Sequence, residues 1–155
     1  MGRIRQGSKL FLGNFNLDEN SFFGGIWKGY TRHTWEIPNT FVGHTFTQGR
    51  NSFGRVDRVE FNAGATFAIS ENVAVMKGWR GVSLGNFNTI KLGGAFTDLN
   101  ENIFWHEYGH TRDSRLFGPF YILIIGIPSA SGAQWTEDRA DEYSRRYRRR
   151  HRIPF

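Results

Sequence analysis

The chain of 155 residues contains no cysteine. Disulfide bonds and thiolate metal ligands are therefore excluded, and only histidine, aspartate or glutamate side chains can hold a metal such as zinc. The chain also lacks a long apolar run, because the longest one, residues 120–127, is far shorter than the roughly 20 residues needed to cross a bilayer. No apolar stretch of the kind found in signal peptides follows the basic first ten residues. We expect a soluble domain without a membrane span.

Proline and methionine are scarce, at four and two residues, whereas glycine and phenylalanine are abundant, at 19 and 15. This balance favours a turn-rich fold packed with aromatic side chains over a helical bundle. With 39% hydrophobic residues, a chain of this length can form one core. We expect a single domain over residues 1–155, with a β-rich part (1–95), a helical part (96–144) and a basic tail (145–155).

Acidic residues are missing from the basic tail, which holds six arginines. These arginines account for the net charge of +6, because residues 1–144 contain 14 basic and 14 acidic side chains. A tail of this kind can bind phosphate backbones or anionic surfaces. A solvated helix end is the commoner explanation for such a charge run, so nucleic-acid binding is our least favoured function.

Short runs rich in Phe, Val, Thr and Trp dominate the first 95 residues and are separated by Gly, Asn and Pro at intervals of roughly ten residues. This pattern predicts a mainly β structure with turns at residues 24–25, 38–39, 49–54 and 93–94. The expected strands are residues 9–15, 34–37, 58–61, 65–69, 81–87 and 89–92.

Two helices are predicted in the later part of the chain. Asp98 and Glu101 have the spacing of a capping box, which marks a helix start, and Gly118-Pro119 marks the end of that helix. A second helix is expected over residues 136–149, which contain neither glycine nor proline. The apolar run 120–127 fits a buried strand or a buried helical turn, and in either case we expect it to pack against the first helix.

Residues 106–110 have the pattern HExxH. Residues four apart on a helix share one face, so His106 and His110 can both bind one metal ion at the 2.0–2.1 Å or so typical of zinc. Glu107 then projects beside the metal and can act as the catalytic base, taking a proton from zinc-bound water. Gly109 permits a close backbone approach. In the alternative interpretation the two histidines are core residues and Glu107 is a surface carboxylate, which requires three correctly spaced residues by chance.

A third zinc ligand is expected on the second helix. A catalytic zinc site has three protein ligands, and Glu137 begins the pattern Glu-x-x-Ala-Asp. Asp141 lies one turn later and can accept a hydrogen bond from a ligating imidazole. Asp138 and Glu142 point elsewhere and are weaker candidates. Glu137 is also compatible with an ordinary acidic residue that complements the helix dipole.

HExxH followed 27 residues after His110 by Glu137 resembles the gluzincin metallopeptidases, in which a glutamate on a later helix completes the zinc site. More narrowly, residues 50–145 are similar to a module at the C-terminal ends of large bacterial proteins, including Rhs-type and other polymorphic-toxin-like chains from Bacteroidetes. One position departs from that module, because Asp113 stands where a glutamine is often found. The segments that carry the likeness are residues 51–67, 81–86, 106–110, 114–115, 118–119, 121, 126–129 and 135–137.

The motifs and the resemblance together imply an α+β, zincin-like fold: a small, mostly antiparallel sheet packed on the HExxH helix and on a C-terminal ligand-bearing helix. We predict a zinc-dependent metallopeptidase-like hydrolase that cleaves a peptide or protein substrate through a zinc-activated water. Zn²⁺ would be bound by His106, His110 and Glu137. The toxin-like relatives imply a chain that is secreted or delivered as part of a larger parent polypeptide.

Gluzincin-like proteins place an edge strand beside the HExxH helix, where a substrate backbone pairs with it. The strand within residues 81–92 is the natural candidate, and the small residues Gly81, Ser83 and Gly85 would let a peptide approach. An ordinary sheet edge is equally compatible with this segment. Three tryptophans could shape a pocket near the metal, although core packing is the commoner role of a tryptophan: Trp79, Trp105 and Trp135.

The residue that would stabilise an oxyanion stays unassigned, because no candidate has a supporting spacing. The available side chains are Tyr143, Tyr147, His33 and His44. This gap and the small size of the chain favour a second hypothesis, in which the domain binds zinc but is a catalytically inactive scaffold or effector module of a toxin-like protein.

Overall fold

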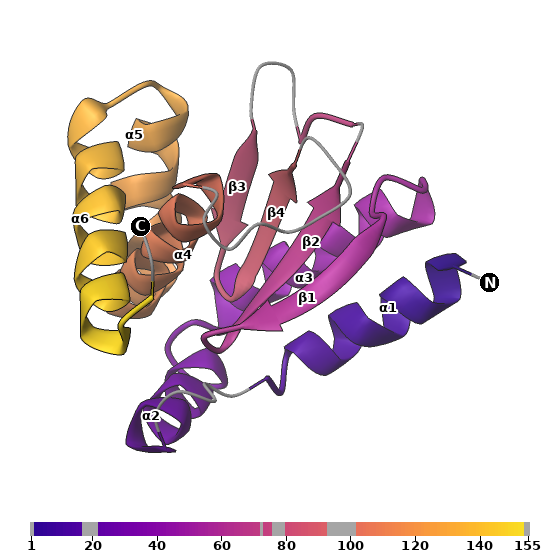
Figure 1. The fold of residues 1–155 in the computed structure, drawn as a ribbon, viewed down its shortest axis with the longest axis horizontal. Coiled ribbons are helices and arrows are strands. Elements are labelled where there is room, and N and C mark those ends of the chain that lie inside the picture. Colours follow the sequence, from indigo (N-terminus) through magenta and orange to yellow (C-terminus); the bar gives the residue numbers. More distant parts are fainter. Residues whose placement is uncertain (1, 17–21, 72, 76–79, 93–101, 154–155) are drawn as a thin grey trace.

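The computed structural model describes residues 2–16, 22–71, 73–75, 80–92 and 102–153. In these segments the fold is α+β, and Figure 1 shows how its elements are arranged. In chain order they are the helices α1 (Gly2–Gly13), α2 (Phe22–Arg32) and α3 (Ile37–Ser52), the strands β1 (Arg58–Asn62), β2 (Ala65–Ser70), β3 (Gly81–Leu84) and β4 (Phe87–Lys91), the helix α4 (Asn102–Phe117), the 3-10 helix η1 (Gly118–Phe120), the π-helix η2 (Ile122–Gly126), and the helices α5 (Ile127–Ala130) and α6 (Gln134–His151).

The four strands form one mixed sheet in the order β1-β2-β4-β3. The outer pairs β1–β2 and β3–β4 are antiparallel, whereas the central strands β2 and β4 are parallel. The expectation of a mostly antiparallel sheet therefore holds for two of the three pairings. Strand β3 lies at the edge of the sheet next to α4, and the tight β3–β4 turn depends on Gly85, whose φ is +62°.

Helices cover both faces of the sheet. On one face Phe67 of β2 stacks on Phe104 of α4, with ring centroids 3.9 Å apart, and Tyr147 of α6 joins the same core. On the other face Leu10 of α1 packs with Ala68 of β2. Neighbouring β2 residues point to opposite faces, so this strand is buried on both sides and all six of its residues are buried.

The two strands expected before residue 40 are wrong. Residues 9–15 belong mostly to α1, residues 34–36 form the turn that leads into α3, and residue 37 is the first of α3. Two glycines in these helices, Gly13 in α1 and Gly43 in α3, serve the packing of helix on sheet. A Cβ on Gly13 would lie 2.4 Å from Thr66 Oγ1, and one on Gly43 would lie 2.1 Å from Leu84 O. These helices need glycine because they press directly against the sheet.

The expected turns have mixed outcomes. Residues 24–25 are helical within α2, and Pro38 occupies the first turn of α3, where proline is favoured. The turn at residues 49–54 is correct only at its end, where Gly54 follows α3 with a φ of +69°. The predicted turn at residues 93–94 and the capping residues Asp98 and Glu101 lie outside the described residues.

The later predictions agree better with the structure. Strands β1 and β2 match residues 58–61 and 65–69, whereas the expected strand 81–87 is interrupted by the turn after β3. Helix α4 ends at Phe117 as expected, and Gly118 has a φ of +51°. Helix α6 extends through the arginine-rich segment to His151.

The apolar run 120–127 is helical, passing from η1 through η2 into α5. The expectation that it is buried holds only for Tyr121 and Ile125, which are 3% and 0% exposed. Four other large apolar side chains of this run are exposed: Phe120, Leu123, Ile124 and Ile127. No helix in the described parts of the chain is long and apolar enough to cross a membrane.

Candidate metal centre

Helix α4 places His106 and His110 on the same face, with ring centroids 4.9 Å apart. Helix α6 packs closely along α4 because Gly109 has no side chain. A Cβ at this position would lie 2.1 Å from Ala140 O of α6. This close approach brings Glu137, one turn before Ala140, over the two imidazole rings.

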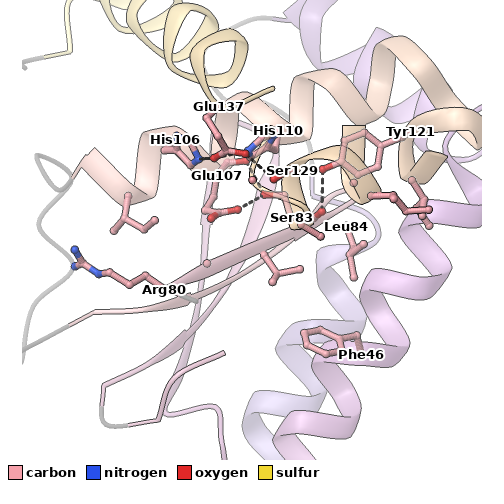
Figure 2. Close-up of a pocket in the computed structure, with 18 of the residues that line it drawn as sticks. Phe46, Arg80, Ser83, Leu84, His106, Glu107, His110, Tyr121, Ser129 and Glu137 are labelled. Atoms are coloured by element: carbon pink, nitrogen blue, oxygen red, sulfur yellow. Dashed lines mark hydrogen bonds and ion pairs between the residues drawn. The ribbon is translucent and has the colours of Figure 1, made fainter. Parts of the chain in front are cut away.

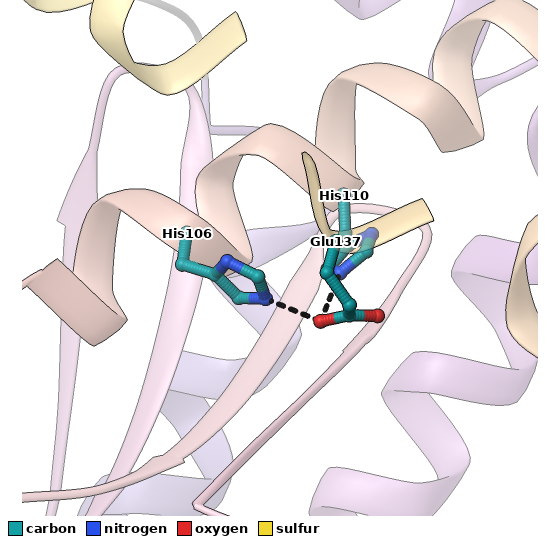
Figure 3. A group of neighbouring side chains, drawn as sticks. All are labelled: His106, His110 and Glu137. Atoms are coloured by element: carbon teal, nitrogen blue, oxygen red, sulfur yellow. Dashed lines mark ion pairs between the residues drawn. The ribbon is translucent and has the colours of Figure 1, made fainter. Parts of the chain in front are cut away.

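The three side chains converge on one point (Figure 3). Glu137 Oε2 lies 3.0 Å from His106 Nε2 and 3.8 Å from His110 Nε2, and the three ligand atoms lie within 4.8 Å of one another. Ligand atoms placed 2.0–2.1 Å from a tetrahedral zinc ion are about 3.3–3.4 Å apart. The cluster can therefore bind a metal ion with small side-chain adjustments.

Asp141 lies on the other side of His106, with its Oδ1 2.8 Å from His106 Nδ1. A carboxylate that accepts a hydrogen bond from one imidazole nitrogen leaves the other nitrogen free to bind a metal. The structure thus brings Asp141 to the position that the sequence spacing implied. In contrast, His110 Nδ1 is buried and has no hydrogen-bond partner among the described residues.

Glu137 is held as a carboxylate. Its pKa is lowered to about 2, chiefly by its interaction with His110 and in addition by a hydrogen bond from Ser129. Ser129 Oγ donates to Glu137 Oε1 at 2.6 Å, which leaves Oε2 to face the histidines. Burial lowers the pKa of His110, but its interactions with Glu137 and Glu107 outweigh burial, so that the net pKa is raised.

Glu107 is 4% exposed and lies between α4 and β3. The Ser83 hydroxyl is 2.7 Å from Glu107 Oε2, and a Cβ on Gly81 would be 1.9 Å from Glu107 Oε1. Burial raises the pKa of Glu107, whereas the neighbouring histidines act in the opposite direction. Glu107 is therefore not the surface carboxylate that the alternative interpretation required.

A cavity of about 590 Å³ opens beside the cluster (Figure 2). Helices α4 and α6 contribute His106, Glu107, His110 and Glu137, and the whole of β3 lines the cavity along the sheet edge. Its other walls are largely apolar, with Phe46 on α3 and a group of residues from α4 and the segment after it: Ile103, Tyr121, Ile122 and Ile127.

Of the remaining predicted residues, some line the cavity and others lie elsewhere in the fold. Gly81 and Ser83 line the cavity, whereas Gly85 packs against the backbone of Thr40. Trp105 is in the core, Trp135 is exposed and does not line the cavity, and Trp79 lies outside the described residues. The four suggested oxyanion partners also lie away from the cavity lining: Tyr143, Tyr147, His33 and His44.

Three hydrogen-bonding roles had no sequence prediction. Ser83 was expected only as a small edge residue, yet its hydroxyl contacts Glu107. Tyr121 OH donates to Ser83 O at 3.0 Å, and Ser129 holds Glu137. Tyr121 and Ser129 fall in segments that carry the resemblance, which was the only signal that marked them. Asp113, the position that departs from the module, accepts a hydrogen bond from Arg139 Nε at 2.6 Å.

Comparison of the chain with models of known protein families, with curated proteins and with solved structures finds no match. The arguments for a function therefore depend on the geometry of this site.

Proposed function

We propose that the chain is a zinc-dependent metallopeptidase-like hydrolase of the gluzincin type. The observation that supports this most strongly is the convergence of His106, His110 and Glu137 on one point beside the buried carboxyl group of Glu107. Two imidazoles and one carboxylate are a donor set used by catalytic zinc sites, which leave one position open for water or substrate.

The residues present fit a zinc ion. The low pKa of Glu137 keeps its carboxylate ionised, and Asp141 orients His106 with Nε2 toward Glu137. Bound zinc in such a site lowers the pKa of water to about 7 and polarises a carbonyl group. The packing of α4 against an edge strand and a ligand-bearing helix is consistent with a zincin-like arrangement.

Glu107 would accept a proton from the attacking water and return it to the leaving amine. The hydrogen bond between Ser83 and Glu107 Oε2 fixes this carboxyl group at the cavity wall. A peptide substrate would lie in the cavity along β3, whose outer edge can pair with an extended backbone. Gly81 and Ser83 are β3 residues that lie directly against the Glu107 carboxyl group.

One observation favours the second candidate, a zinc-binding scaffold or effector module without turnover. Tyr121 is the only phenol among the described residues that line the cavity, and its hydroxyl is buried and engaged with Ser83 O. An oxyanion donor must be aimed at the position where charge develops. Either candidate is compatible with a secreted or delivered part of a larger bacterial protein, as the resemblance implies.

Zinc content and peptide cleavage separate the candidates. We expect about one zinc per chain in the wild type and little in His106→Ala, measured by elemental analysis after dialysis. Glu107→Gln should keep its zinc and lose cleavage of a broad peptide library by about 10²–10⁴-fold. Glu142→Gln is the matched control, because Glu142 is exposed and pairs with Arg146.

Each result leads to a different conclusion. Cleavage that is lost in Glu107→Gln but kept in Glu142→Gln supports the hydrolase. Stoichiometric zinc without cleavage by the wild type supports the scaffold. A wild type that binds no zinc, or a His106→Ala protein that binds as much as the wild type, rejects both.

A further inference from the structure

Helix α2 has the reverse of the polarity expected of a surface helix. Its apolar side chains face outward, with exposed fractions of 77% at Phe22, 82% at Phe23, 54% at Ile26, 60% at Trp27 and 61% at Tyr30. These positions recur at helical spacing and form one continuous face. Single exposed apolar residues are ordinary, but a contiguous patch marks an interaction surface. We call these five residues the apolar face.

The opposite side of α2 buries two cations. Lys28 Nζ donates to Ala63 O at 3.0 Å and to Tyr108 OH at 3.2 Å. Arg32 is 2% exposed and donates to four carbonyl oxygens and one side-chain amide: Gly13 O, Asn14 O, Asn16 O, Gly64 O and Asn86 Oδ1. Separating a buried cation from its partners is strongly unfavourable, so α2 cannot rotate to hide its apolar face.

The arginine-rich end of α6 lies beside α2. Lys28 Nζ of α2 is 5.5 Å from the ring centroid of Tyr147 of α6, and Figure 1 shows both helix ends on the same side of the molecule. This end has exposed side chains at Arg149, Arg150 and Arg152, which we call the arginine end. The exposed arginines that carry much of the net positive charge of the chain therefore lie at the end of α6 that packs beside α2.

Exposed carboxylates are missing from the described residues of the N-terminal helices. Residues 2–16 and 22–52 contain a single acidic side chain, Glu36, which is 1% exposed. The surface that includes α2 therefore combines apolar side chains with positive charge and has no exposed negative charge in those segments.

We propose that the apolar face of α2 and the arginine end of α6 together dock on the surface of an anionic lipid bilayer. Helix α2 would lie in the plane of the interface, with its phenylalanines and Ile26 among the acyl chains. Trp27 and Tyr30 suit the headgroup level, where their amphipathic rings are favoured. The arginine end would contact lipid phosphates, since basic residues near an anionic surface are attracted to it.

Two other partners fit the surface less well. Single-stranded nucleic acid binds in grooves where bases stack on aromatic rings between basic side chains, whereas Phe22, Phe23 and Ile26 lie on a convex helix. A second copy of the chain that paired through the same face would bring two arginine ends toward each other, and like charges repel. Neither partner uses the apolar and the basic parts of the surface as fully as an anionic bilayer does.

The test is flotation of the full chain with vesicles of phosphatidylcholine alone or with 30% phosphatidylglycerol. We expect the wild type to float with the anionic vesicles and to bind the neutral ones at least about tenfold more weakly. The double variant Phe23→Glu/Ile26→Glu should bind anionic vesicles at least about tenfold more weakly than the wild type. A triple variant with glutamine at Arg149, Arg150 and Arg152 should lose about as much binding, and high salt should have the same effect.

Phe53→Glu is the matched control, because Phe53 is 79% exposed but follows the far end of α3, a 16-residue helix about 24 Å long. It should float like the wild type, and the melting temperatures of all variants should agree because every changed side chain is exposed. The proposal is overturned if the wild type does not float, or if Phe23→Glu/Ile26→Glu floats as well as Phe53→Glu. A dimer in light scattering that Ile26→Glu abolishes, or salt-dependent RNA binding without flotation, also overturns it.

Discussion

Two convergent polar clusters in the structure have opposite characters. Around Arg32, five oxygen atoms surround a cation that the chain itself supplies. At His106, His110 and Glu137, the converging atoms are ring nitrogens and a carboxylate oxygen, all of which can donate lone pairs to a metal. The Arg32 cluster is closed by the protein, whereas the second cluster faces a cavity.

This difference distinguishes a structural cluster from one that could bind a metal ion. Arg32 connects α2 to the loop after α1 and to the sheet, and its burial lowers its pKa to about 10. Its partners are mostly backbone carbonyls, which have no other chemical role there. The His–His–Glu cluster uses side chains from two helices, and two of them are oriented by a further residue, His106 by Asp141 and Glu137 by Ser129. Variants should therefore affect folding at the first cluster and metal affinity at the second.

The largest expected effect is on folding. Arg32→Met leaves five acceptors without their donor, and we expect it to lower the free energy of unfolding by about 3–5 kcal/mol. Urea denaturation measures this value, and Arg55→Met at an exposed position is the control. If the folded fraction of Arg32→Met still binds zinc with wild-type affinity, the two clusters are independent. A reduced zinc affinity in that fraction would show instead that the Arg32 cluster and the His–His–Glu cluster depend on each other.

The next effect concerns the metal itself. Zinc at 100 times its dissociation constant should raise the free energy of unfolding by about 2.7 kcal/mol, because it binds the folded chain alone. Thermal denaturation with zinc and with a chelator measures this difference. His110→Ala should remove it, whereas His33→Ala, at an exposed site away from the cavity lining, should keep it. A zinc effect that persists in His110→Ala would place the metal elsewhere.

The His–His–Glu cluster was more predictable from the sequence than the Arg32 cluster, for a physical reason. HExxH places His106 and His110 on one face through local helix geometry alone. Glu137 was predicted from a second pattern on a later helix. The close approach of the two helices depends on Gly109, a residue that the sequence analysis had already singled out for this reason. Arg32 gave no such signal, because its five partners are set by the tertiary fold and none lies within ten residues of it.

The N-terminal helices were misassigned for a related reason. Gly13 lay inside the expected strand 9–15, yet Gly13 and Gly43 are needed where helices touch the sheet, and that contact is set by the tertiary fold. Strands β1 and β2 were found because their hydrophobic residues and flanking turns are local features. The role of Ser83 was not predictable either, since its contact with Glu107 arises only when β3 packs on α4.

A smaller effect is expected at Asp141. Asp141→Asn keeps the size of the side chain but removes the charge that holds His106, and we expect zinc affinity to fall by about 10–100-fold. Competition with a fluorescent zinc chelator measures the change. Glu142→Gln is the neighbouring control, because Glu142 contacts Arg146 and no residue of the cluster. Equal affinities for the two variants would show that His106 needs no carboxylate partner.

The smallest effect is expected at Ser129, whose hydroxyl group donates to Glu137 Oε1. Ser129→Ala leaves this oxygen with Thr136 Oγ1, which is 3.2 Å away, so Glu137 keeps one neighbouring donor. One hydrogen bond contributes about 1 kcal/mol, which predicts roughly a fivefold loss of zinc affinity in the same competition assay. Ser131→Ala is the control, since Ser131 Oγ donates to Ile127 O in the same segment without touching the cluster. A loss as large as that of Asp141→Asn would mean that Glu137 depends on Ser129 for its orientation as strongly as His106 depends on Asp141.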